Sequence, residues 1–161
     1  MSTRTPNMDA LAIEAVRSVV LRTGLLLDGH DLTGWLALFE SDGVYELRAY
    51  STEIRQWMTW WLATRGELEK TLSEVVQHVC DPAQRRHVIG APVVTQQGDK
   101  ALALAVSPFS IFRTLPDGVS SLYMVGHYED TLAVREGVWR ISRRTVVTDT
   151  RVLDMFTHIP V

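Results

Sequence analysis

Cysteine is almost absent from this sequence, because Cys80 is the one thiol among 161 residues. One thiol cannot form an intrachain disulfide, and it cannot supply the ligands of a four-cysteine zinc site or an iron–sulfur cluster. Its neighbours Asp81 and Pro82 offer no positive charge that would activate a thiol, so we interpret Cys80 as an inert packing residue. A single cysteine is compatible with a reducing compartment.

Long apolar runs and a basic surplus are also missing. The longest apolar run, residues 19–27, is interrupted by Arg22 and Thr23, whereas a membrane-spanning helix needs about 20 apolar residues. The first residues lead directly into an amphipathic pattern instead of the apolar core of a signal peptide. The net charge is −3, from 16 basic and 19 acidic residues, which gives no basic footprint for nucleic acid. We therefore expect a cytoplasmic protein with no membrane or nucleic-acid partner.

Motifs that hold metals or nucleotides are not found in the sequence. The histidines are His30, His78, His87, His127 and His158, and no two have the His-x-x-x-His spacing of a helical zinc site. The sequence has no GxGxxG, no phosphate loop and no GxSxG elbow. Two histidines and a carboxylate could still meet across the fold and hold iron, but no spacing points to it. We expect no metal and no cofactor in this chain.

The composition is that of an ordinary globular domain, with 46% hydrophobic and 22% charged residues. The length also suits one domain. We expect a single domain over residues 1–161, with a flexible arm over residues 1–8 and a tail over residues 150–161.

Apolar residues recur with helical spacing in much of the first half of the chain. Asn7 or Asp9 can cap the first helix, and Thr64 with Glu67 forms a capping box that begins the last one. Residues 57–62 are ambiguous, because a short apolar run fits a strand or a helix. The patterns predict helices from residue 9 to 28, 32 to 39 and 64 to 80, a strand over 44–49, and a turn over 41–43.

After Pro82 the apolar period changes to two. The alternation predicts strands over residues 86–96, 101–113, 120–133 and 138–149. Their short glycine-containing links require antiparallel neighbours. Helices followed by a meander indicate an α+β fold, with the helices packed on one face of a curved sheet. Small residues at positions 101, 103, 105 and 107 would let a helix, or another subunit, approach closely.

Two groups of residues are candidates for function. Arginine pairs on two predicted strands, and charges near the end of the chain, could contact an anion, form structural salt bridges or hold subunits together. We predict subunit contacts for Arg85, Arg86, Arg143, Arg144, Asp149, Arg151 and Asp154. The second group would face an open mouth between the helices and the sheet, where acid–base chemistry is conceivable. These cavity candidates are Tyr45, His87 and His127.

Several short stretches occur in an order and spacing that resemble one protein family. They are Glu14-Ala15, Leu27-Asp28, residues 35–39 and 42–45, Arg85 to Gly90, residues 143–150 and Ile159 to Val161. Over residues 9–161 this pattern is similar to the small (β) subunit of aromatic-ring-hydroxylating dioxygenases, which have the cone-shaped fold of the NTF2-like, or SnoaL-like, superfamily. The ending is similar to the subgroup that acts on aromatic acids such as terephthalate. Residues 53–61 lack the prolines and paired aspartates of many relatives, so we expect Trp57 to Trp61 to face an environment particular to this protein.

The resemblance implies an oxidoreductase component in aromatic catabolism. In such enzymes the large (α) subunit holds a Rieske 2Fe-2S cluster and a mononuclear iron, fed with electrons from NAD(P)H. The β subunit typically has no cofactor and forms a homotrimeric base in an α3β3 hexamer. We therefore expect a non-catalytic β subunit whose partner is the large subunit. The alternative is a stand-alone NTF2-like isomerase, dehydratase, hydrolase or ligand-binding protein.

Overall fold

A computed structural model describes residues 8–78, 81–98, 101–152 and 158–161 of the chain. Most of the expected N-terminal arm lies outside the described residues. Cys80 and Asp154 lie outside them as well, so their predicted roles stay predictions.

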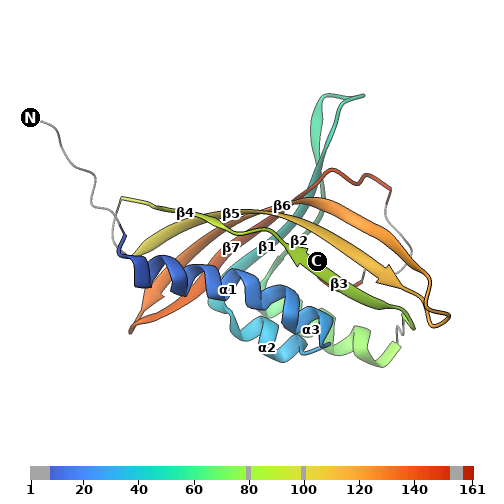
Figure 1. The fold of residues 1–161 in the computed structure, drawn as a ribbon, viewed down its shortest axis with the longest axis horizontal. Helices are drawn as coiled ribbons and strands as arrows, with labels where there is room; N and C mark the ends of the chain where they lie inside the picture. The colour runs from blue at the N-terminus through green and yellow to red at the C-terminus, as the bar shows by residue number, and fades with distance from the viewer. Residues whose placement is uncertain (1–7, 79–80, 99–100, 153–157) are drawn as a thin grey trace, which may run out of the picture.

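Among the described residues, three helices lie together on one face of a curved sheet, from which the β1–β2 hairpin projects beyond the body of the molecule (Figure 1). The strand order is β2-β1-β7-β6-β5-β3, and β4 also pairs with β5. Every pair is antiparallel except β1 with β7, which is parallel. The predicted α+β cone is confirmed. The elements are α1 (Ala10–Asp28), α2 (Leu32–Ala37), β1 (Phe39–Ser51), β2 (Gln56–Thr64), α3 (Arg65–His78), β3 (Gln84–Ile89), β4 (Val93–Gln96), β5 (Leu102–Thr114), β6 (Ser120–Arg135) and β7 (Val138–Thr148).

Three boundaries differ from the prediction. Phe39 begins β1 instead of ending a helix, because it is buried and pairs with Ile141 of β7. The turn predicted over residues 41–43 is instead an irregularity within β1, where the register with β7 shifts. The strand predicted over residues 86–96 is two strands, since Pro92 has no amide to donate to a ladder. The ambiguous residues 57–62 belong to β2.

The small-residue face of β5 is covered within the chain. Ala103, Ala105 and Ser107 are all fully buried, and α1 packs against this strand. The prediction that a helix can approach closely here is confirmed. Within the described residues, no helix is long and apolar enough to cross a membrane.

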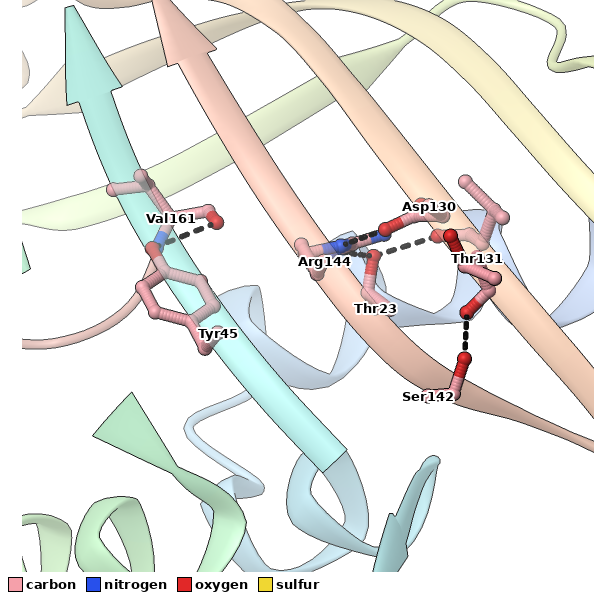
Figure 2. Close-up of polar contacts among 8 residues, drawn as sticks. Thr23, Tyr45, Asp130, Thr131, Ser142, Arg144 and Val161 are labelled. Atoms are coloured by element: carbon pink, nitrogen blue, oxygen red, sulfur yellow. Dashed lines mark hydrogen bonds and ion pairs between the residues drawn. The ribbon is translucent and has the colours of Figure 1, made fainter. Parts of the chain in front are cut away.

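A buried ion pair joins β6, β7 and α1. Arg144 is fully buried and donates two hydrogen bonds of 2.8 Å to the carboxylate of Asp130, which is also buried. A third donor of the same guanidinium reaches Oγ1 of Thr23 on α1 at 2.8 Å (Figure 2). The guanidinium also lies over the ring of Tyr128, 4.3 Å from its centre. The planar fork of arginine suits this bidentate arrangement, because both carboxylate oxygens are satisfied at once.

The position of Arg144 corrects its predicted place at a subunit interface. Side chains alternate between the two faces of a strand, so Arg143 and Arg144 cannot both face a partner. Arg143 points outward, with 46% of its side chain exposed, and pairs with Glu46. Arg144 has no exposed surface and belongs to the core.

Breaking the buried pair should destabilise the chain strongly. We expect Arg144→Met to lower the free energy of unfolding by about 3–5 kcal/mol, because the Asp130 carboxylate is left buried without its cation. The control is Arg151→Met, which breaks an ion pair with Glu53 that is exposed on both sides and should cost less than about 1 kcal/mol. Urea denaturation followed by circular dichroism measures both. The double variant Arg144→Met/Asp130→Leu should recover much of the loss, and equal losses in the two single variants would contradict the assignment.

Gly126 tests the packing of β6 on β7. A Cβ at this position would lie 2.2 Å from the backbone oxygen of Val147, so Gly126→Ala should destabilise the chain by roughly 1–3 kcal/mol. Gly66, in the first turn of α3, has nothing within 4 Å of the same position. Gly66→Ala should therefore stabilise the chain by up to about 1 kcal/mol. Thermal unfolding of the two variants distinguishes these opposite signs, and the same sign in both would refute the packing argument.

Candidate functional site

A cavity of about 220 Å³ opens where the end of α1 meets α2, α3 and β3. Most of its wall is apolar, and a few polar side chains reach it from β3 and the segment before it. The lining residues are Leu27, His30, Leu32, Val75, Asp81, Ala83, Arg85, His87, Ile159 and Pro160.

His87 and Asp28 form a buried dyad at this cavity. Nδ1 of His87 lies 2.7 Å from Oδ1 of Asp28, and the side chains are only 1% and 4% exposed. The backbone amide of His87 also donates to both carboxylate oxygens, at 3.1 Å. The guanidinium of Arg86 approaches the same carboxylate at 3.6 Å. These contacts hold the imidazole in one orientation.

The end of α1 explains why Asp28 is available for this contact. The helix stops at Gly29, whose amide donates to the carbonyl of Leu25, and the next residue, His30, has a positive φ of 56°. A carboxylate at the C-terminal end of a helix lies at the negative end of the helix dipole, which is unfavourable. The donors from β3 offset this cost, so Asp28 and β3 depend on each other.

Gly24 brings α1 close enough to β3 for the dyad to form. A Cβ at Gly24 would lie 2.9 Å from Cβ of His87 and 2.9 Å from Cδ1 of Ile89. Distances this short do not occur between real side chains, so any larger residue would push the helix away from the strand. The close approach of Gly24 to the side chains of β3 thus determines how deeply His87 is buried.

A second charged group lies beside the dyad. Arg113 of β5 donates two hydrogen bonds to Asp81, of 2.8 and 3.2 Å, and Arg85 approaches the same carboxylate at 4.0 Å. Burial opposes ionisation of Asp81, but the hydrogen bonds from Arg113 and from the amide of Ala83 outweigh it and lower the pKa of Asp81. The guanidinium of Arg85 also lies over the ring of Tyr123, at 4.6 Å. The wall of the cavity therefore combines apolar side chains with the charged Asp81 and Arg85.

The other two cavity candidates lie elsewhere. Tyr45 is fully buried in the core, where its hydroxyl accepts a hydrogen bond of 3.2 Å from the amide of Val161 (Figure 2). His127 contacts Glu129 at 3.3 Å, and both face away from the helices because they alternate with the buried Tyr128 and Asp130. The strand register thus brings His87 to the cavity and leaves Tyr45 and His127 outside it.

Among the described residues that line the cavity, none is a serine, threonine or cysteine that could act as a nucleophile. When Nδ1–H of a neutral imidazole donates to a carboxylate, Nε2 carries the lone pair and can accept a proton or a hydrogen bond. Nε2 of His87 is buried and has no hydrogen-bond partner among the described residues. Within the same residues, no three histidine, cysteine or acidic side chains are grouped so that they could hold a metal ion.

The sequence identified His87 but not its partners. Asp28 and His87 are 59 residues apart, and Asp81 and Arg113 are 32 apart. Asp28 meets His87 because α1 packs on β3, and Arg113 meets Asp81 because β5 pairs with β3, which begins just after Asp81. The signals for Asp28 were its position at the predicted end of the first helix and its place in one of the stretches that resemble the β-subunit family.

Comparison with known proteins assigns the chain to a family. The model of the SnoaL-like domain matches residues 8–145. The β subunit of the methanesulfonate monooxygenase hydroxylase of Methylosulfonomonas methylovora is 33% identical over 93% of this chain and 87% of that one. The chain belongs to the SnoaL-like β subunits of ring-hydroxylating and related oxygenases.

Further relatives of this β-subunit family agree. The β subunit of 2-aminobenzenesulfonate 2,3-dioxygenase from Alcaligenes sp. is 26% identical over 84% of this chain and 90% of that one. A terephthalate 1,2-dioxygenase β subunit from Comamonas sp. is 32% identical over 47% of this chain and 48% of that one. The crystal structure of a β subunit assigned to an aromatic-ring-hydroxylating dioxygenase of Novosphingobium aromaticivorans shares the fold, with a TM-score of 0.83, 24% identity, and coverage of 94% of this chain and 97% of that one.

The predicted interface residues of this β subunit divide between its two faces. Arg86, Arg143, Asp149 and Arg151 are exposed, and Arg151 pairs with Glu53 near the tip of the β1–β2 hairpin. Arg85 instead lines the cavity, because it alternates with Arg86 along β3. We therefore assign Arg85 to the interior of the cone and keep the four exposed residues as interface candidates.

The buried tyrosines of the β subunit predict a loss of stability at alkaline pH. Burial raises the pKa of Tyr45 to about 12, although the hydrogen bond with Val161 and the charge of Arg144 act in the opposite direction. Burial raises the pKa of Tyr128 as well. An unfolded tyrosine ionises near pH 10. The free energy of unfolding therefore keeps its full value below pH 10 and falls as the pH rises toward 12, because in this range only the unfolded chain can ionise the tyrosine.

Urea denaturation between pH 8.5 and 12 measures this loss. At pH 11, which is one pH unit above the pKa of an unfolded tyrosine, we expect Tyr45 alone to lower the free energy of unfolding by about 1.4 kcal/mol. Tyr45→Phe should therefore show a shallower decline above pH 10 than the unaltered chain, even if it is less stable at pH 8.5. Parallel declines in the two proteins would mean that Tyr45 ionises as freely in the fold as in the unfolded chain.

Proposed function

We propose that this chain is the non-catalytic β subunit of a Rieske-type oxygenase. Its role is to hold large subunits together as the trimeric base of an α3β3 hexamer. The Rieske 2Fe-2S cluster and the mononuclear iron belong to the large subunit, and this chain contributes assembly. The observation that carries the proposal is the match of 33% identity over 93% of the chain to an oxygenase β subunit.

The edge strand β2 supports an assembly role. It lies at one end of the strand order, next to β1, and Trp57 and Leu62 on it are 51% and 59% exposed. An apolar edge strand left in water is prone to pair with other chains. Trp57 is also held in place, because Tyr50 packs edge-on against it and the guanidinium of Arg48 lies 4.5 Å from its ring centre. A rigid, exposed tryptophan is a typical centre of a binding interface.

The outer face of the sheet provides a second surface suited to subunit contacts. It carries the ion pairs of Arg48 with Glu129 and of Arg143 with Glu46. Next to them, Val106 on β5 is exposed. An apolar centre with charged surroundings is common in subunit interfaces. We assign this face to contacts between β subunits and the β2 edge to the large subunit.

We further propose that the assembled enzyme acts on an aromatic acid. The names of the relatives include terephthalate and 2-aminobenzenesulfonate, both anions of aromatic acids, and methanesulfonate, an anion without a ring. An acidic group is common to all three substrates. The assembled enzyme should therefore be assayed with aromatic carboxylates and sulfonates, and with methanesulfonate as the substrate without a ring.

Co-expression with a Rieske-type large subunit encoded beside this gene tests the proposal. A tag on this chain should capture the large subunit, and native mass spectrometry should give equal numbers of the two chains in a hexamer. Iron and acid-labile sulfide should accompany the large subunit and should be absent from this chain purified alone. A chain that stays monomeric and captures no large subunit under these conditions would overturn the proposal.

Substitutions on β2 test the assigned surface. Leu62→Glu and Trp57→Ser should weaken capture of the large subunit at least 30-fold, the effect of losing about 2 kcal/mol at the centre of an interface. Neither should change the circular dichroism spectrum of the isolated chain. Leu11→Glu is the matched control, because Leu11 is 83% exposed on α1. Assembly that is weakened by Leu11→Glu but not by the β2 variants would place the large subunit elsewhere.

The buried dyad favours a second candidate function. His87 and Asp28 could serve as a base in a stand-alone isomerase or dehydratase, since His87 lines a cavity. This candidate requires that the isolated chain turns over a small molecule and that His87→Gln abolishes turnover. Capture of the large subunit together with an inactive isolated chain would eliminate it.

A further inference from the structure

The two edges of the sheet differ in how they are protected against pairing with other strands. One edge is formed by β3 and β4, which lie one after the other along β5. These strands have only 6 and 4 residues, and the segment between them contains Pro92. Arg86 on β3 adds a charge that is 67% exposed. Short strands, prolines and charges are features that keep a sheet edge from pairing with another chain.

The opposite edge, β2, has none of these features. It runs for 9 residues, from Gln56 to Thr64, without a proline or a charged side chain. Of the strands that the structure describes, β1 alone pairs with β2, and Ala63 is the one buried residue along its length. Within the described part of the chain, the backbone groups on the outward side of β2 therefore have no partner strand.

The edge strand β2 is nevertheless held firmly in place. Trp61 packs edge-on against the buried Tyr45, with the ring centres 5.6 Å apart. Trp57 packs in the same way against Tyr50, at 5.4 Å. The end of the β1–β2 hairpin extends beyond the body of the molecule (Figure 1). A strand that is already ordered loses little conformational entropy when another strand is added to it.

The chemistry of β2 restricts what can pair with it. Its outward backbone groups match another extended segment, whose own N–H and C=O groups complete the ladder. The side chains of that segment should be uncharged where they face Trp57 or Leu62, because β2 has no charge to compensate a group that loses its water there.

Symmetry restricts the source of the added strand. A second copy of this chain could offer its own β2, but two identical edges that pair antiparallel meet around a two-fold axis and close as a dimer. The trimeric base proposed for this chain requires three-fold contacts between copies. An added strand on β2 therefore suits a different chain, and the large subunit is the different chain in the proposed hexamer.

We propose that an extended, uncharged segment of the large subunit adds to β2 as a further strand of the sheet. This inference rests on the proposed function and adds the mode of contact. Backbone hydrogen bonds along β2 hold the segment, and the exposed Trp57 and Leu62 contact its side chains.

Proline substitutions at two neighbouring positions test the backbone contact. Successive amides of a strand point to opposite sides, so one of Met58 and Thr59 donates toward β1 and the other donates outward. Proline is tolerated in an edge strand where the lost amide faced outward. Of Met58→Pro and Thr59→Pro, the variant that keeps the circular dichroism spectrum of the isolated chain should bind the co-expressed large subunit about tenfold more weakly, because one hydrogen bond of the ladder is lost.

The matched control is alanine at the same position, which removes the side chain but keeps the amide. The alanine variant should bind the large subunit as the unaltered chain does. Equal binding by the proline and alanine variants would overturn strand addition and leave the proposed function intact. Failure of the unaltered chain to capture the large subunit would instead remove the proposed function.

Amide exchange resolved to single residues gives a second test, which needs no variant to fold. From Gln56 to Thr59 the pairing with β1 is regular, so every second amide there faces outward. On assembly with the large subunit, these outward amides should slow at least about tenfold, because they gain hydrogen bonds. Protection without this alternation would contradict strand addition, and a dimer of the isolated chain with the same protection would show that the added strand comes from a second copy.

Discussion

The structure depends on one buried interaction, the bidentate pair of Arg144 and Asp130. It ties β7 to β6 at the centre of the sheet, and through Thr23 it ties the sheet to α1. Tyr128 lies under the guanidinium and stacks on Phe109 of β5, with the ring centres 4.3 Å apart. Because removing either charge would leave the other unpaired in the core, these four elements must stay in register.

The inner and outer faces of the sheet carry different members of the arginine pairs. Arg144 and Arg85 point inward, while the preceding Arg143 and the following Arg86 point outward. The inner face holds the core and, beside it, the cavity with His87. The outer face and the β2 edge carry exposed charges and apolar side chains. A β subunit can thus present an assembly surface without disturbing the cavity, because the cavity is lined from β3 and the helices, whereas the proposed surface lies on β2 and on the outer side of β1, β5, β6 and β7.

Much of this fold followed from the sequence, and the remainder required long-range pairing. Helix ends such as Asp28-Gly29 and the capping box at Thr64 have local causes, so their positions were predicted. The parallel pairing of β1 with β7 and the placement of Phe39 in β1 depend on strands about 100 residues apart. The same applies to the site: His87 was a candidate from its residue type, but Asp28 joins it only through the packing of α1 on β3. Treating Arg143-Arg144 as a unit failed because strand alternation separates neighbours.

The claim that assembly uses the β2 edge and the outer face, while the cavity remains free, can be tested directly by amide hydrogen exchange. The measurement compares this chain alone with the chain in complex with its large subunit. In the complex we expect exchange to slow in β2, whose outward amides have no neighbouring strand in the sheet order, and to stay unchanged around His87 and Leu27. Protection around the cavity with none in β2 would contradict this division of the molecule.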